Sequence, residues 1–374
     1  MLFDDLAASL IKVTHAPVPW LFIIVFLLGL AAYFAGGLTL GRIWCRSSWS
    51  AAAFIFVLTL RHRITLTGAN TLEGYLHPRT LAFAMGVWAL VAFLRGRLLA
   101  TAVCLVVATT LHTTTALWFV LWIGVALAVS DPRAWRPLAI AAVIGAAAGI
   151  WALWFGPMRE QLQQMDDQWL AVLDLKDYLF PTKWPLSAWL INFAYPVIIC
   201  VGYRMRAARR TTHVREGALV VGALALTAIF VLSLPFIMMR VALAVQLQVS
   251  RVFWLLEYMA ALYLVWMALE SGKDARRWVT VLVAIAAVSR GVYIMRVEQP
   301  GRPIVQVTVP EDAWTDVMRW VRRTPPDTHI LADPAHAFRY GTSERVLGER
   351  DVFLESSKDT ALAIYSRAIA HRVF

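Results

Sequence analysis

Ten long apolar segments, separated by short polar connections, constrain the fold of this chain more than any other feature. In a bilayer the backbone must satisfy its own hydrogen bonds, and a helix needs about 20 mostly apolar residues to cross about 30 Å of hydrocarbon. The segments are residues 19–40, 49–63, 80–94, 98–112, 114–130, 137–155, 187–203, 217–236, 252–270 and 278–295. They predict an all-α polytopic membrane protein with about ten transmembrane helices, the shorter ones tilted, broken or re-entrant.

The composition of the chain points the same way. Hydrophobic residues make up 60% of the chain and charged residues 16%, whereas soluble domains have roughly 45–50% and about 25%. The 17 Trp and 18 Phe are typical of aromatic belts at bilayer surfaces. The three cysteines lie in or beside apolar segments, without the spacing of a metal site or a redox pair. A soluble globular fold is therefore excluded.

The distribution of Lys and Arg predicts the orientation. With residues 41–48 in the cytoplasm, the short inside connections carry 14 Lys and Arg, and the outside segments 1–18, 64–79, 156–186 and 237–251 carry 7. Because cytoplasmic loops are enriched in these residues, we expect the N-terminus, residues 64–79 and everything after residue 296 to lie outside. The net charge of +11 then faces anionic lipid, and no nucleic acid is expected as a partner. The expected location is a bacterial inner membrane.

Three parts follow from this topology. Residues 1–18 form an extracytoplasmic amphipathic segment, 19–296 the transmembrane domain, and 297–374 an extracytoplasmic tail. The tail is more polar and predicts a helix over 310–323, then a short strand, then an amphipathic helix over 359–373. We therefore expect a small α/β domain at the C-terminus.

The sequence at each end of the chain predicts that further segments adjoin it. An N-terminus outside, without a cleavable signal, indicates either that an initial span precedes this chain or that the first span inserts N-out. The chain stops within the pattern of its last helix, so we expect the tail domain to continue. In the long loop 156–186, Leu162, Met165 and Trp169 recur at helical spacing and predict an amphipathic helix on the outer interface.

A dense polar stretch lies between two of the most apolar segments, where residues 70–79 have the sequence NTLEGYLHPR. One interpretation is a solvated loop. The other, which we favour, is the wall of an outward-facing polar pocket that binds a substrate. The candidate ligands in and just before this stretch are Arg61, Arg63, Glu73, His77 and Arg79.

Four further polar residues are predicted to lie on or near the outer side. His112 is either a hydrogen-bonded turn residue or a substrate ligand, and Arg251 either a snorkelling anchor or a phosphate ligand. Arg240 shares a polar helix face with Arg251. Glu257 lies about two turns inside a span, where a carboxylate is costly unless it is paired or faces a cavity. Arg290 is a plausible charge partner for it, so Glu257 is either structural or functional.

The segment after the last span carries a recognisable run. Its pattern is W-x₅-W-V-x₂-T-P-x-D-T-x₂-L-x₂-P, from Trp314 to Pro334. With the order of an acidic outer segment, many spans and an extracytoplasmic tail, this run resembles the GT-C superfamily of polyprenyl-phosphate-sugar glycosyltransferases and their bacterial relatives. The resemblance covers most of the chain in layout. It implies a transferase that moves a sugar at the outer face, with membrane lipid and a lipid-linked sugar as partners.

The resemblance also implies which residues act. In that superfamily one or two acidic residues on the first extracytoplasmic loop serve as the catalytic base or bind a metal. The matching positions are Asp4 and Asp5 in LFDDL. The family has a span ahead of that loop, and this chain begins just before it. Asp4 and Asp5 are thus the implied catalytic residues, and a divalent cation stays open as a cofactor.

Two other functions stay open from the sequence. A transporter or flippase for a lipid-linked or polar solute fits broken helices and Glu257, but no internal repeat relates the two halves. A non-catalytic membrane scaffold with a partner-binding tail is the third. The sequence contains no Walker A loop, HExxH motif or GxSxG elbow, which argues against an ATP-driven pump and a zinc protease.

Overall fold

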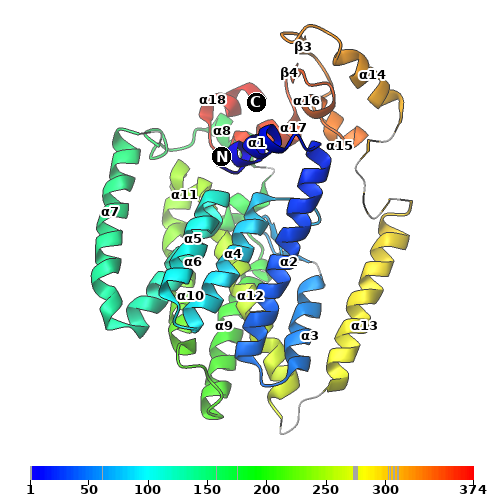
Figure 1. Ribbon diagram of the computed structural model, residues 1–374. Helices are drawn as coiled ribbons and strands as arrows, with labels where there is room; N and C mark the ends of the chain where they lie inside the picture. Colours follow the sequence, from blue (N-terminus) through cyan, green and yellow to red (C-terminus); the bar gives the residue numbers. More distant parts are fainter. Residues whose placement is uncertain are drawn as a thin grey trace. The chain divides into compact units, whose positions relative to one another are not determined.

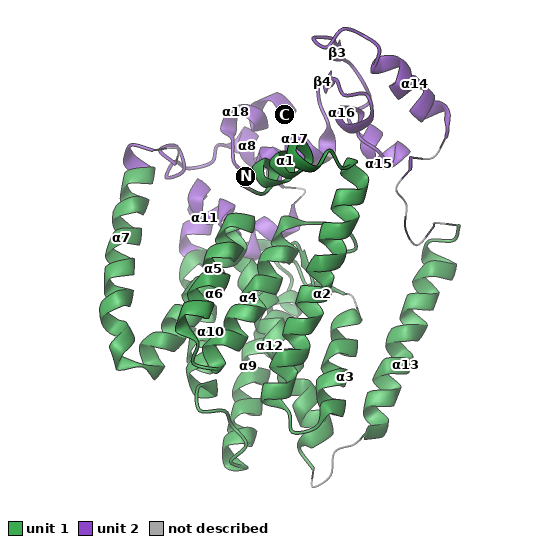
Figure 2. Ribbon diagram, viewed as in Figure 1, with its two compact units in different colours: residues 1–152, 183–234, 249–302 green, residues 153–182, 235–248, 303–374 purple. Residues whose placement is uncertain are grey.

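The computed structural model describes residues 2–60, 62–156, 158–174, 176–272, 277–301, 303, 305, 308–309 and 311–374. The chain forms two compact units, each assembled from stretches that lie far apart in the sequence (Figure 2). Unit 1 contains residues 1–152, 183–234 and 249–302, and unit 2 contains residues 153–182, 235–248 and 303–374. The tail therefore folds together with two segments that come from between the apolar helices.

All ten apolar segments form helices (Figure 1). The helices wholly or mostly in unit 1 are α1 (Leu2–Thr14), α2 (Val18–Trp44), α3 (Ser48–Thr59), α4 (Pro78–Leu94), α5 (Leu98–Leu111), α6 (Thr113–Ser130), α7 (Trp135–Trp154), α9 (Leu186–Ala208), α10 (Glu216–Met238), α12 (Val252–Glu270) and α13 (Arg277–Tyr293). In the part of the chain that the structure describes, seven helices are long and apolar enough to cross a membrane. The helices α3, α4 and α5 are shorter, with 12, 17 and 14 residues. A mostly helical, multi-pass membrane protein is confirmed at this level, and the number of spans stays a prediction.

The helix α12 forms the centre of unit 1. Its sequence is apolar on all sides, the pattern of a helix surrounded by other helices. Phe83 of α4 stacks on Trp254 with ring centroids 4.2 Å apart, and Tyr33 of α2 meets Tyr258 edge-on at 5.9 Å. Gly86 of α4 allows a close approach, since a Cβ atom there would lie 2.4 Å from the ring of Phe119 on α6. Aromatic packing thus holds α2, α4 and α6 around α12.

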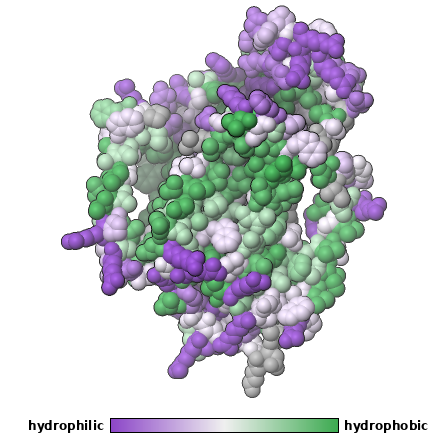
Figure 3. Space-filling model, viewed as in Figure 1, coloured by the Kyte–Doolittle hydropathy of each residue, from purple (hydrophilic) through white to green (hydrophobic). Residues whose placement is uncertain are grey.

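The helices α7 and α13 stand at the edges of unit 1 (Figure 1). α7 has no buried residue among those described, and α13 buries only Thr280. Figure 3 shows the matching surface, in which hydrophobic side chains cover the sides of the helices and hydrophilic ones gather at their lower ends. A broad apolar outer surface suits hydrocarbon as the solvent.

A short hairpin follows α3 and leads into α4. Its strands β1 (Arg63–Ile64) and β2 (Ala69–Asn70) pair antiparallel, with Arg63 opposite Asn70. The turn between them includes Gly68, whose φ of 65° is readily adopted only by glycine. This hairpin carries the first half of the polar stretch that the sequence singles out.

Unit 2 combines short helices with one strand pair. Its helices are α8 (Asp167–Leu173), α11 (Ala242–Gln246), α14 (Ala313–Val321), α15 (His336–Tyr340), α16 (Glu344–Leu347), α17 (Ser356–Leu362) and α18 (Arg367–Val373). The strands β3 (His329–Ile330) and β4 (Asp351–Val352) pair in parallel. Trp169 of α8 is 1% exposed, and its Nε1 donates to the carbonyl of Ala363 at 2.6 Å. This core joins a loop of the apolar region to the tail.

Three segments differ from the sequence-based expectations. The helix expected in loop 156–186 is reduced to α8, because the Asp166 carboxylate caps it and the residues before it form turns. Its apolar side lies in the core of unit 2. The helix expected over 359–373 divides into α17 and α18, the second capped by Ser366. Residues 238–251 form α11 and a 3₁₀ turn, so they present no single polar helix face.

Candidate functional site

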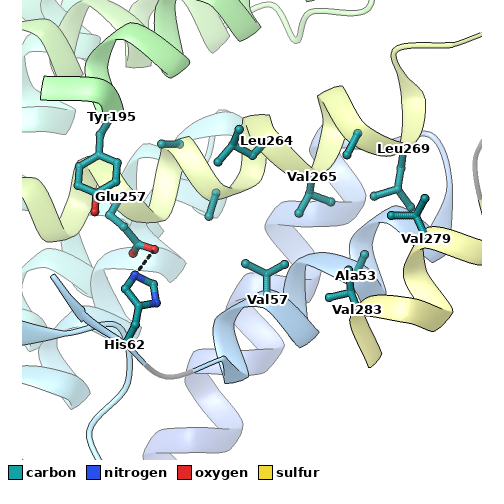
Figure 4. A pocket seen from close by; sticks show the side chains of 13 residues that line it. Ala53, Val57, His62, Tyr195, Glu257, Leu264, Val265, Leu269, Val279 and Val283 are labelled. Carbon is teal, nitrogen blue, oxygen red and sulfur yellow. Dashed lines mark ion pairs between the residues drawn. The ribbon is translucent and has the colours of Figure 1, made fainter. Parts of the chain in front are cut away.

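A cavity of about 390 Å³ lies between α3, α12 and α13 of unit 1 (Figure 4). One end is polar, where His62, Tyr195 and Glu257 meet. The rest is aliphatic and is lined by Ala53, Val57, Ala260, Ala261, Leu264, Val265, Ala268, Leu269, Val279 and Val283. Between Glu257 and Leu269 the wall follows α12, and at about 1.5 Å per residue this stretch is about 18 Å long. The cavity is therefore a slot with a polar end and an apolar shaft.

Glu257 is the buried charge of this slot. The residue is 5% exposed, and its Oε1 lies 3.3 Å from Nε2 of His62. Its other oxygen, Oε2, is buried without a hydrogen-bond partner among the described residues. The partner expected from the sequence was Arg290, but the Arg290 guanidinium pairs with Glu298 at 2.5 Å. That expectation is wrong, because the loop after α3 brings a histidine to Glu257.

His62 follows the C-terminal end of α3, outside the helices. Its Nε2 faces the Glu257 carboxylate, and its Nδ1 lies 3.2 Å from the carbonyl oxygen of Leu60. Two acceptors facing two ring nitrogens favour the imidazolium, in which both nitrogens carry a proton. The hydrogen bond to Glu257 accordingly raises the pKa of His62 above its usual value, although burial opposes this. The contact with Glu257 thus favours the protonated form of the His62 ring.

The residues that line the slot determine which chemistry and which ligands it supports. Because Oε2 of Glu257 has no hydrogen-bond partner among the described residues, the carboxylate can accept a proton from a hydroxyl group that reaches this oxygen. Tyr195 of α9 points toward the same place and adds a phenolic hydroxyl (Figure 4). The aliphatic shaft offers no hydrogen bonds and suits a hydrocarbon chain. The slot therefore fits an amphiphile whose polar head meets His62 and Glu257.

Glu73 and Arg79, predicted as ligands, are turned toward each other. Glu73 is 1% exposed and Arg79 8% exposed, and an Arg79 Nη2–H donates to Oε1 of Glu73. Asn70 donates to the other Glu73 oxygen at 3.0 Å, and Arg79 Nη1 donates to the Gly68 carbonyl at 2.8 Å. A buried pair with these bonds ties the hairpin to the start of α4. Their geometry supports holding the loop in place and gives no support to a ligand role.

His77 and His112 form a second polar group. Each precedes a helix, and their ring centroids lie 6.2 Å apart. Burial, helped by the positive charges of Arg79 and Arg251, lowers the pKa of His77 to about 4. Burial and the same arginines lower the pKa of His112 to about 3. The structure thus brings together two of the predicted ligands, His77 and His112, and neither lines the slot.

The other predicted site residues lie elsewhere. Asp4 and Asp5 are exposed on α1, and neither lines the slot. Arg63 is exposed on β1, and Arg61 lies outside the described residues. Arg240 belongs to unit 2, where it pairs with Asp167 at 2.8 Å. Within the described chain no three His, Cys, Asp or Glu side chains gather in a way that could hold a metal ion.

Two residues of the slot escaped the sequence-based selection. His62 stands between Arg61 and Arg63, both of which were selected, and Tyr195 lies inside an apolar helix. The available signal was the cost of a carboxylate inside a span, which demands a partner from elsewhere in the chain. Arg290 was the predicted partner because it also lies in a span, whereas the observed partner is a histidine in a connecting loop.

Comparison with known proteins adds no assignment, because no protein-family profile, curated protein or solved structure matches the chain.

Proposed function

We propose that this protein is a GT-C-like glycosyltransferase that takes a sugar from a polyprenyl-phosphate donor at the outer face of a bacterial inner membrane. The observation that carries the proposal is the slot, in which a buried carboxylate closes the end of an apolar shaft and one of its oxygens has no hydrogen-bond partner in the described chain. Such a shape accepts the reactive end of a lipid and keeps its chain in hydrocarbon. The excess of Lys and Arg in the other connections supports an outer location for the loop that carries His62.

In this proposal Glu257 is the catalytic base. Oε2 of Glu257 takes the proton of the acceptor hydroxyl while the acceptor oxygen bonds to the anomeric carbon of the sugar. The bond between that carbon and the phosphate oxygen breaks, and polyprenyl phosphate leaves with the bonding electrons. The imidazolium of His62 holds Oε1 in place at 3.3 Å. General-base catalysis of this kind contributes about 10²- to 10⁴-fold to the rate.

The donor would enter from the bilayer. Among its described residues the α13 wall of the slot buries only Thr280, so most of the surface of α13 faces away from the other helices. A lipid chain can then pass from the membrane into the shaft between α3 and α13. The polar end stays covered by the loop that contains His62, which limits the access of water to Glu257.

This assignment places the base at Glu257, whereas the family resemblance implies Asp4 and Asp5. The two aspartates are exposed on α1, and neither lines the slot. Glu257 is 5% exposed and faces a cavity of suitable shape. The two assignments differ in a measurable way.

The test uses the full chain in proteoliposomes with a panel of radiolabelled polyprenyl-phosphate hexoses and a membrane extract as acceptor. Glu257→Gln should lower transfer at least 100-fold, because the amide cannot accept the proton. The double variant Asp4→Asn/Asp5→Asn should keep most of the activity. Loss of transfer in the aspartate variant with full transfer in Glu257→Gln would restore the aspartates as the base. No transfer by the unchanged chain from any donor would contradict the proposed function.

One observation favours transport as a second candidate. A titratable pair, His62 and Glu257, lies in and beside a helix long enough to span a membrane, and such pairs serve as proton relays in transporters. Transport would make the release of a fluorescent lipid-phosphate analogue from one leaflet depend on a pH gradient. Leaflet exchange that needs both the gradient and Glu257, without sugar transfer, would favour this candidate.

A further inference from the structure

Thr71, which directly follows strand β2, contacts the ring of His62 through its hydroxyl group. Its Oγ1 lies 3.0 Å from Nδ1 and 3.2 Å from Nε2 of His62. The residue is 1% exposed, whereas the side chain of His62 is 46% exposed. A buried hydroxyl group thus faces a ring that is itself half in the open. The polar stretch 70–79 reaches the slot through this contact.

Thr71 holds the backbone of His62 as well as its ring. The backbone N–H of Thr71 donates to the carbonyl oxygen of His62 at 3.0 Å, and the Thr71 hydroxyl donates to the same oxygen at 3.2 Å. A hydroxyl group has one hydrogen and two lone pairs, so with its hydrogen on the carbonyl it can only accept from the ring. An accepting hydroxyl suits the protonated ring, which carries an N–H at each nitrogen.

Thr71 is in turn attached to the helix core of unit 1. The hydroxyl of Tyr33 on α2 donates to the carbonyl oxygen of Thr71 at 3.3 Å, and Tyr33 is 0% exposed. The ring of Tyr33 meets that of Tyr258 edge-on at 5.9 Å, and Tyr258 follows Glu257 directly on α12. The hydroxyl of Thr71 is therefore fixed relative to the helix that carries the Glu257 carboxylate.

We infer that Thr71 is a positioning residue that holds the ring of His62 against Glu257. His62 lies outside the helices, and a half-exposed side chain keeps its rotamer freedom unless its neighbours restrain it. Catalytic groups work only when supporting hydrogen bonds hold them within about 0.5 Å of their productive place. Thr71 does not line the slot, so it acts through His62. Its effect on catalysis rests on the proposed transferase, whereas its hold on His62 can be measured without any transfer.

The test removes the hydroxyl group and keeps the shape of the side chain. Thr71→Val replaces the hydroxyl by a methyl group, and Thr71→Ser keeps the hydroxyl. Thr67→Val is the matched control, because Thr67 is a 0% exposed threonine of the same hairpin whose Oγ1 donates to the Ile64 carbonyl at 2.9 Å. The pKa of His62 is measured by NMR on the full chain in nanodiscs with labelled histidine, and His62→Gln identifies its signal.

In Thr71→Val the proton affinity of the His62 ring should fall about tenfold, because the ring leaves the carboxylate that favours its protonated form. In a Glu257→Gln background the same change should have much less effect, since the ring has no carboxylate to leave. Thr71→Ser and Thr67→Val should titrate like the unchanged chain. An unchanged pKa of His62 in Thr71→Val would overturn the inference, as would an equal fall with and without the Glu257 carboxylate.

The rate of sugar transfer separates this inference from the proposed function. Thr71→Val should lower transfer about tenfold, and Thr71→Ser should keep most of it, because misplacing a catalytic group slows the reaction without removing the group. Full transfer by Thr71→Val, in a chain that transfers, would overturn the positioning role. No transfer by the unchanged chain, together with the expected His62 titrations, would contradict the transferase and support the placement of His62 by Thr71.

Discussion

Two buried glutamates of unit 1 differ in how completely their charge is satisfied. Glu216 at the start of α10 is 0% exposed, and its carboxylate accepts from Arg206 Nε at 2.8 Å and Nη2 at 3.1 Å. It also accepts from the His213 backbone N–H at 2.9 Å and from the Tyr263 hydroxyl at 3.0 Å. Glu257 is nearly as buried, but among the described residues its carboxylate pairs with His62 alone, at 3.3 Å, and Oε2 has no hydrogen-bond partner.

The contrast separates a structural carboxylate from an available one. The Glu216 group is closed on all sides, because Arg206 is also held between the rings of Trp44 and Trp266 at 5.2 and 5.0 Å. A charge with four hydrogen bonds has no capacity left for a substrate. Glu257 has that capacity, and a cavity lies beside it. Burial alone would therefore rank the two residues alike, whereas their partners rank them in opposite order.

The largest expected effect is on stability at the closed pair. Arg206→Met removes one partner and leaves the Glu216 charge buried, which should lower the free energy of unfolding by about 3–5 kcal/mol. Denaturant unfolding of the detergent-purified chain measures it. Glu257→Gln is the matched change at the open carboxylate and should alter stability by less than about 1 kcal/mol. Equal destabilisation by the two changes would remove the distinction between them.

A smaller effect is expected in the pH dependence of stability. The pKa values of His77 and His112 are about 4 and about 3 in the folded chain, below about 6.5 in the unfolded one. Between these values the unfolded chain binds protons that the folded chain does not, so stability falls as the pH drops from about 6.5 toward 4. The double variant His77→Asn/His112→Asn should lose less stability over this range. Thermal unfolding at pH 7 and pH 5 would show it, and identical slopes would contradict the assigned burial.

Much of the fold could be predicted from the sequence because hydropathy is a local property. All ten apolar segments became helices, within a few residues of their predicted ends. The amphipathic segment at the N-terminus also became a helix, α1. The loop 156–186 could not be predicted correctly from its own sequence. Its apolar residues pack on the tail, which is distant in the sequence, so they become buried without forming a long helix.

The site was predicted only in part, since its contacts join distant residues. Glu257 could be selected because a carboxylate in a span is costly. Its partner His62 precedes it by almost two hundred positions, and no periodicity links them. Glu73 and Arg79 were predicted as ligands because many polar residues lie close together in one loop. Because the two residues are near each other in this loop, they pair with each other instead. The roles of Asp4 and Asp5 stay a prediction.

The most direct test of the account measures whether the slot holds a lipid chain. Val57 of α3 lines the aliphatic shaft, and Val57→Trp would fill it with an indole ring. Leu282→Trp on α13 is the control, because Leu282 is 53% exposed and is not one of the residues that line the slot. Affinity for polyprenyl phosphate, measured on the full chain in nanodiscs, should fall at least about tenfold in Val57→Trp and stay unchanged in Leu282→Trp. Unchanged affinity in Val57→Trp, or an equal loss in both variants, would contradict the account.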